Sequence, residues 1–102
     1  MINKVFLIGR LGSDVKIFST VNGKMARFSL ATSETWKDKD GQKQEKTDWH
    51  NIVVTGTLIN LMDYIHKGSL VFVTGKLRYR EVENSKQADV FASEIQILES
   101  KK

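Results

Sequence analysis

Residues 49–68 read WHNIVVTGTLINLMDYIHKG, a strand-like run followed directly by a helix-like run. In the strand-like part, Ile52 and Val54 occupy one parity, as expected for a strand with one face in a core. The helix-like part carries apolar residues at the spacing i, i+3, i+4, i+7, namely Leu58, Leu61, Met62 and Ile65. A helix this short is marginal on its own, so we expect it to cover apolar strands.

The predicted α-helix spans residues 58–67, with Thr57 as its N-cap and Gly68 just past its C-terminus. Around it, further strand-like segments occupy residues 1–11, 15–21, 24–36, 70–80 and 88–98. Asn22 and Gly23 predict a two-residue type I′ turn, and residues 37–46 predict a polar loop. Counted as about five strands, this order predicts an all-β fold. We expect a five-stranded oligonucleotide/oligosaccharide-binding (OB) barrel with one short α-helix between the third and fourth strands.

Length and composition limit the possible classes of protein. The 102 residues suffice for one domain with one core, and a formal charge of +4 favours a polyanionic partner. Cysteine is absent and only two histidines are present, so we expect no disulfide, no metal site and no cofactor. No apolar run is long enough to cross a bilayer, and the start lacks a signal-peptide pattern. We therefore expect a soluble protein that does not bind membranes.

Two tryptophans flank the predicted polar loop, which carries four lysines. Trp49 shares its parity with Asn51 and Thr55 rather than with the core residues of its strand, and Trp36 and Lys37 begin the loop on the other side. Large flat rings beside cations suit an unpaired nucleic acid strand, whose bases stack while its phosphates meet positive charge. We predict that these five residues form part of a nucleic-acid site. The alternative is that both tryptophans are core residues.

A second basic group follows on a later strand. Lys76, Arg78 and Arg80 are spaced i, i+2, i+4, which places all three on one face of a strand. Arginine suits phosphate contacts, so we predict that this face binds the nucleic acid backbone. An ordinary solvated edge is the alternative. Leu77 and Tyr79 lie on the opposite parity and are expected to pack inward, with strand twist near the end that turns Tyr79 outward as the alternative.

Other residues favour a subunit interface over catalysis. His50 shares the parity of the core residues on its strand, which indicates a packed or interfacial histidine. The first strand is apolar on both parities, with Val5 and Leu7 on one of them, so we expect it to pack on a second subunit. The sequence shows no serine or cysteine nucleophile with partners, no phosphate loop and no paired carboxylates. We therefore expect no enzyme activity.

Several motifs together resemble the bacterial single-stranded DNA-binding protein family across nearly the whole chain. They are Asn3-Lys4-Val5, Ala31-Thr32-Ser33-Glu34-x-Trp36, Thr47-x-Trp49-His50 and Lys67-Gly68-Ser69. The resemblance implies an OB-fold homotetramer that coats single-stranded DNA during replication, recombination and repair. It also implies a cytoplasmic, nucleoid-associated protein of bacteria.

The resemblance assigns roles to individual residues. The stacking tryptophans of the family match Trp36 and Trp49, its basic strand-end positions match Arg78 and Arg80, and its interfacial histidine matches His50. Two further aromatic positions of the family do not carry over, because this chain has Thr55 and Val82 there. Fewer rings are therefore expected to stack on bases.

The C-terminal end and one alternative complete the prediction. The family usually continues through a flexible linker to an acidic tip that recruits replication and repair enzymes, whereas this sequence ends Glu99-Ser100-Lys101-Lys102. We expect one domain over residues 1–102, no acidic tail and no such recruitment.

The alternative is a dimeric primosome-type OB protein that acts mainly through protein–protein contacts. A duplex binder is disfavoured, because no helix carries the basic residues.

Overall fold

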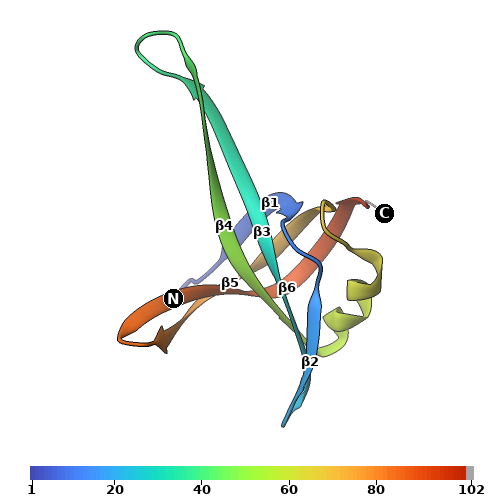
Figure 1. Cartoon of the computed structure of the whole chain (residues 1–102). Helices are drawn as coiled ribbons and strands as arrows, with labels where there is room; N and C mark the ends of the chain where they lie inside the picture. Colours follow the sequence, from blue (N-terminus) through green and yellow to red (C-terminus); the bar gives the residue numbers. More distant parts are fainter. Residues whose placement is uncertain (101–102) are drawn as a thin grey trace.

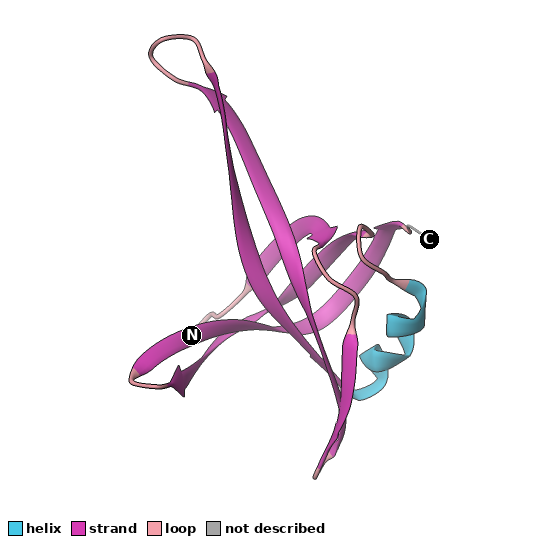
Figure 2. Ribbon diagram, viewed as in Figure 1, coloured by secondary structure: helices cyan, strands magenta, loops and turns pink. Residues whose placement is uncertain are grey.

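The computed structural model describes residues 1–100, which form six strands and one short helix (Figure 1). In chain order these are β1 (Val5–Leu11), β2 (Lys16–Thr20), β3 (Gly23–Lys37), β4 (Lys43–Thr55), the helix η1 (Gly56–Tyr64), β5 (Leu70–Val82) and β6 (Ser85–Glu99). Figure 2 shows the β3–β4 hairpin projecting far from the other strands and the helix lying to one side of them. Lys101 and Lys102, where part of the C-terminal prediction falls, lie outside the described residues.

Five of the strands form a closed ring. β1 pairs with β5, β5 with β6, β6 with β4, β4 with β3, and β3 with β1. All these pairings are antiparallel except that of β4 with β6. β2 is an additional strand that pairs with β3. The predicted five-stranded OB barrel is confirmed, and η1 lies between the third and fourth strands of the ring, as expected.

The core fills the ring with side chains from alternate positions of its strands. They include Ala26, Phe28 and Leu30 of β3, Ile52 and Val54 of β4, and Val71 and Val73 of β5. The helix contacts β3, β4 and β6, and the buried side chains of Met62 and Ile65 join this core. The predicted core parities of β3 and β4 are therefore confirmed, and the amphipathic helix does cover the strands.

The prediction of an α-helix over residues 58–67 was wrong in type and extent. The helix is a 3₁₀-helix over Gly56–Tyr64, and Thr57 lies inside it instead of capping it. Hydrogen bonds to the first strand and its loop hold the chain just after the helix. The Lys67 N–H donates to Asp14 Oδ1 at 2.9 Å, and the Gly68 N–H donates to the Leu11 carbonyl at 2.8 Å. These tertiary bonds favour a short, tight helix over a longer α-helix.

The hairpin turns also differ from the prediction. Thr20 lies opposite Gly23, so the β2–β3 loop consists of Val21 and Asn22, and only Gly23 has a positive φ, of 122°. A type I′ turn needs positive φ at both loop residues, which a β-branched Val21 disfavours. The turn with two residues at positive φ is instead Glu83 and Asn84, with φ of 47° and 68°, between β5 and β6.

Half of the predicted polar loop of residues 37–46 is strand. β3 and β4 pair as far as Lys37 opposite Lys43, so the tip of the hairpin is only residues 38–42. Asp38 organises this tip by accepting hydrogen bonds from the Asp40 and Gln42 N–H groups, both at 2.9 Å, and from Gln44 Nε2 at 3.0 Å. The bond from Gln42, assisted by those from Gln44 and Asp40, lowers the pKa of Asp38 below its ordinary value.

Candidate nucleic-acid interface

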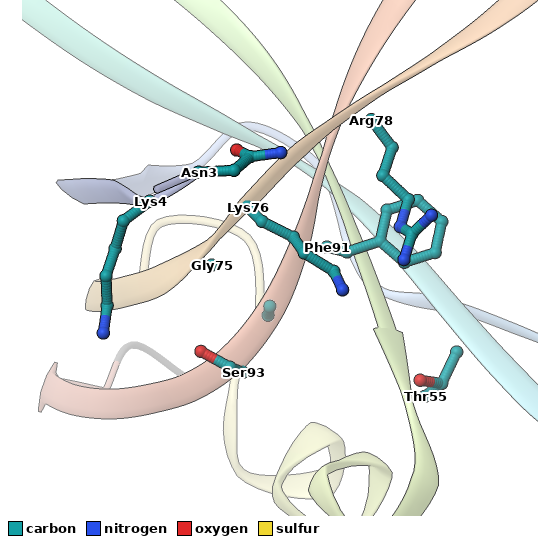
Figure 3. Close-up of a pocket in the computed structure, with 9 residues that line it drawn as sticks. Asn3, Lys4, Thr55, Gly75, Lys76, Arg78, Phe91 and Ser93 are labelled. Atoms are coloured by element: carbon teal, nitrogen blue, oxygen red, sulfur yellow. The ribbon is translucent and has the colours of Figure 1, made fainter. Parts of the chain in front are cut away.

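A concavity lies where the start of the chain, the end of β4, β5 and β6 meet. It has a volume of about 660 Å³ and is lined by Asn3, Lys4, Thr55, Gly75, Lys76, Arg78, Phe91, Ala92 and Ser93 (Figure 3). We call it the main groove. Its nine lining residues include three cations and no carboxylate. Three of the predicted site residues, Thr55, Lys76 and Arg78, therefore lie together beside a positively charged hollow.

Phe91 is a groove residue that the sequence analysis did not assign to the site. The guanidinium carbon of Arg78 lies 5.4 Å from the centroid of its ring, which is a cation–π contact. Figure 3 shows the two side chains against each other. Phe91 is only partly buried, so the groove contains an aromatic surface beside its cations.

A β-bulge turns Phe91 outward. Thr74 lies opposite Glu94 but Gly75 lies opposite Ala92, so Ser93 is an extra residue in β6. Val90 on one side of the bulge and Ile95 on the other both point into the core, although their parities differ. Their mismatched parity in the sequence is the signal that could have revealed the bulge and, with it, the outward position of Phe91.

Gly75 allows β5 and β6 to approach closely beneath the groove. A Cβ atom built on Gly75 would lie 2.3 Å from the Phe91 carbonyl oxygen. Real Cβ atoms essentially never come so near another atom, and here the neighbour is backbone that cannot move aside easily. The floor of the groove therefore depends on glycine at this position.

Asn3 extends the sheet beyond the start of β1. Its side chain accepts a hydrogen bond from the Leu77 N–H at 2.9 Å and donates one to the Leu77 carbonyl at 2.8 Å. This paired contact substitutes for a strand residue and fixes the chain beside Lys4. Asn3 and Lys4 are thus placed at the rim of the groove by local hydrogen bonding.

Arg80 lies on the predicted face of β5 but has a partner in the fold. Its Nε donates to Asp89 Oδ2 at 2.8 Å, and Arg27 Nη1 lies 3.7 Å from the same oxygen. Asp89 is only 2% exposed. A phosphate role for Arg80 stays a prediction. The ion pair uses Nε, so the two terminal nitrogens of the guanidinium remain for a phosphate contact. Tyr79 is 67% exposed, so the expectation that it packs inward was wrong, whereas Leu77 does pack against the core.

Trp49 lies on the outer face of β4, on the parity that the sequence indicated. It is 64% exposed, and a Cβ atom built on Gly12 would lie 2.2 Å from Cζ3 of its ring. The ring therefore rests on the backbone of Gly12 and leaves most of its surface free. Asn51 and Thr55 are also exposed, but Val53, on the same parity, is buried.

Trp36 and Lys37 lie apart from the main groove. Trp36 is 48% exposed and pairs with Gln44 near the tip of the β3–β4 hairpin, and Lys37 pairs with Lys43 beside it. Trp49 lies opposite Ala31, an odd-numbered residue of β3, so the register places the two tryptophans on different faces of the hairpin. Neither tryptophan is a core residue, but the structure does not bring the two rings together on one face of the hairpin.

The residues expected at a subunit interface contact other residues of the same chain. His50 is partly buried, with its Nε2 2.8 Å from Thr32 Oγ1. Val5 and Leu7 are partly buried against the core of their own chain. The exposed apolar side chains of β1 are instead Phe6 and Ile8. The interfacial roles of His50, Val5 and Leu7 stay predictions.

Residues 1–100 offer neither a grouped set of metal ligands nor a helix that could span a membrane. No group of three or more histidines, cysteines and carboxylates in this part of the chain is arranged to hold a metal ion. Its one short helix is too short to span a bilayer.

The sequence matches the model of the Single-strand binding protein family over residues 2–101. The chain belongs to this family. Two relatives, each named single-stranded DNA-binding protein, come from Neisseria meningitidis serogroups A and B. Each is 39% identical to the chain over 104 residues, which cover 95% of this chain and 60% of the relative. The chain thus spans 60% of the length of these single-strand binding proteins.

Solved structures of single-strand binding proteins share the fold. The structure titled "Plasmodium falciparum SSB complex with ssDNA" has a TM-score of 0.84 and 35% identity, and the match covers 97% of this chain and 96% of that one. The wild-type single-stranded DNA binding protein of Thermus aquaticus has a TM-score of 0.79 and 32% identity, covering 96% of this chain and 50% of that one. A small single-stranded DNA-binding protein of Streptomyces coelicolor, with a TM-score of 0.78 at 22% identity, shares the fold over 95% of this chain and 94% of its own.

Proposed function

We propose that this protein binds single-stranded DNA independently of sequence and protects it during replication, recombination and repair. The observation that carries the proposal is the main groove, in which Lys76 and Arg78 lie beside the partly exposed ring of Phe91. Cations can neutralise phosphates there while the ring stacks on a base. Membership of the Single-strand binding protein family and the printed names of its relatives support the same function.

Trp49 extends the proposed site along the outer face of β4. Its exposed ring offers a second stacking surface, and Asn51 and Thr55 on the same face offer polar groups for the strand. Trp36 and Lys37 form a separate arm of the site on the projecting hairpin. Each stacked base would contribute about 1 to 3 kcal/mol. Binding of this kind needs no catalytic residues, and it would place the protein with DNA in the bacterial cytoplasm, at the nucleoid.

Titration with poly(dT) at several salt concentrations tests the proposal, with duplex DNA of matched length as the control. We expect quenching of tryptophan fluorescence by poly(dT) and much weaker binding of the duplex. Log affinity should fall with log salt by about 0.7 for each phosphate contact, and Arg78→Gln should flatten that slope. Equal affinity for duplex, or no binding of poly(dT) at low salt, would refute the function.

We propose that the assembly is a homotetramer. Within the described chain, residues 5–9 of β1 pair only with β5, so the other edge of this stretch offers unpaired backbone groups to a second copy. An apolar outer face is supplied by Phe6 and Ile8, which are 63% and 55% exposed. Phe72 adds to this face, with its ring edge-on to that of Phe6 and the two ring centroids 6.3 Å apart. Analytical ultracentrifugation would test this. A dimer would favour the primosome-type alternative, and a stable monomer would exclude both assemblies.

A further inference from the structure

A second concavity lies on the outer face of β2, β3 and β4. It has a volume of about 220 Å³ and is lined by Ser13, Lys16, Arg27, Phe28, Ser29 and Asn51. We call it the β3 pocket. Among its residues only Asn51 was expected at the site from the sequence. Its polar lining consists of two cations, two hydroxyl groups and one amide. The Ser29 hydroxyl donates to Ser13 Oγ at 3.3 Å, which leaves the Ser13 hydroxyl, the amide and the two cations to donate hydrogen bonds to an anion.

The two cations of the β3 pocket lie directly opposite each other. Lys16 of β2 pairs with Arg27 of β3, so their side chains share one face of the hairpin at neighbouring positions. Like charges directly opposite each other in an antiparallel pair are destabilising. Such an arrangement becomes favourable when an anion lies between the two cations.

The buried carboxylate of Asp89 neutralises only part of this charge. Asp89 Oδ2 is shared between Arg27 Nη1 at 3.7 Å and Arg80 Nε at 2.8 Å, so two cations share one carboxylate. Lys16, opposite Arg27 in the register, adds a third positive charge. Arg27 lies opposite Val53 in the register, and Asp89 lies beyond β4, on β6. The Arg27 guanidinium therefore reaches across β4, which accounts for the burial of Val53 and fixes the guanidinium on the outer face.

The β3 pocket is continuous with the other proposed contacts. Asn51 lies between Trp49 and Val53 on the outer face of β4, and Thr55, farther along that face, lines the main groove. The Trp49 ring rests on Gly12, the residue before Ser13. A strand that stacks on Trp49 and reaches the main groove along β4 would pass over the β3 pocket.

We propose that the β3 pocket binds a phosphodiester group of the single strand, with Lys16 and Arg27 as its ligands. The proposal rests on the proposed function and adds a second backbone contact, on β2 and β3, to the basic face of β5. Lys24 is the matched control, because it is an exposed lysine of the same β2–β3 hairpin that lines neither concavity.

The test measures anisotropy of fluorescein-labelled oligo(dT) against salt concentration for Lys16→Gln, Arg27→Gln and Lys24→Gln. Loss of one phosphate contact should reduce the slope of log affinity against log salt by about 0.7. If the affinities are equal at about 1 M salt, the variant then binds roughly eight-fold more weakly than the unmodified protein at about 0.05 M salt. We expect this for Lys16→Gln and Arg27→Gln but not for Lys24→Gln. Because Arg27 also pairs with Asp89, Lys16→Gln at an exposed residue carries the test if Arg27→Gln does not fold.

A protection experiment gives an independent readout. The sequence contains no cysteine, so Lys16→Cys and Lys24→Cys each introduce a single thiol. Oligo(dT) should slow alkylation of Lys16→Cys several-fold and leave Lys24→Cys unaffected. If Lys16 and Lys24 variants behave alike in both experiments while Arg78→Gln flattens the slope, the pocket proposal fails and the proposed function stands. If the unmodified protein does not bind oligo(dT), both fail.

Discussion

Arg78 and Phe91 form a cation–π pair on neighbouring strands, with the guanidinium carbon 5.4 Å from the centroid of the ring. The contact holds the guanidinium at the groove, and a guanidinium keeps five N–H donors for other partners. A phosphate can therefore bind at the edge of the guanidinium while a base stacks on the uncovered part of the ring. One contact thus combines both kinds of recognition that a single strand needs.

Phe91→Leu should weaken binding of oligo(dT) by about 1 to 3 kcal/mol, because leucine keeps apolar bulk but has no face on which a base can stack. Fluorescence anisotropy would measure this. Phe18→Leu is the matched control, since Phe18 is an exposed phenylalanine of β2 outside the groove. Equal affinities for the two variants would contradict a stacking role for Phe91.

Trp49→Ala should weaken binding by about 1 to 3 kcal/mol while changing the melting temperature little, because the ring is largely exposed. Truncation of a buried tryptophan would instead cost about 3 to 5 kcal/mol of folding free energy. Thermal melts and oligo(dT) titrations on the same variant distinguish the two. Trp36→Ala, run in parallel, measures the contribution of the hairpin arm. A large loss of stability with normal binding by the folded protein would exclude stacking on Trp49.

Thr55→Phe should strengthen binding, because it adds a ring at the end of β4 that lines the main groove together with Phe91. The expected gain is at most about 1 to 3 kcal/mol, the contribution of one stacked base. Titration with oligo(dT) would measure it against Thr57→Phe, an exposed threonine in η1 outside the groove. Unchanged or weaker binding by Thr55→Phe would show that the strand does not pass this position.

The Asp38 carboxylate should stabilise the hairpin tip in a pH-dependent way. Its folded-state pKa is lowered, chiefly by the hydrogen bond from the Gln42 N–H, so its contribution is present above the ordinary pKa of aspartate. The contribution is lost as pH falls through the lowered pKa. The Gln42 amide resonance in NMR spectra should therefore titrate with a midpoint below the usual range of aspartate. Absence of this titration in Asp38→Asn would confirm the assignment, and a midpoint at the usual value would contradict it.

The barrel and the outward parity of Trp49 were predictable because they depend on local patterns. The core residues of β3 and β4 fall on alternate positions, and the helical stripe ending at Ile65 follows directly. The i, i+2, i+4 spacing of Lys76, Arg78 and Arg80 holds in the structure because β5 is regular there, so all three are exposed. Within such segments, the sequence period and the fold report the same face.

Features that depend on distant parts of the chain were missed. The outward position of Phe91 follows from a bulge at Ser93, and the partner of Arg80 is a carboxylate on the next strand. The helix ends early because residues after it bond to Leu11 and Asp14, more than fifty positions away. The bulge leaves a trace in the parities of Val90 and Ile95, but no local period records the bonds to Asp89, Leu11 and Asp14, since each is decided by which strands become neighbours.

The parallel pairing of β4 with β6 extends over only three residue pairs, with Asn51 beside Asp89 and Val53 beside Phe91. It is the shorter of the two strand pairings of β4, and it joins the outer face of β4 to the main groove residues of β5 and β6. Because the proposed site draws on both sides of this pairing, a strand can contact all of it only when the ring is closed. Bound DNA would therefore stabilise the native state by mass action. The free energy of unfolding would rise by about 1.4 kcal/mol for each tenfold rise in free DNA above the dissociation constant. Thermal stability would then rise with DNA occupancy, because both follow from the same binding equilibrium.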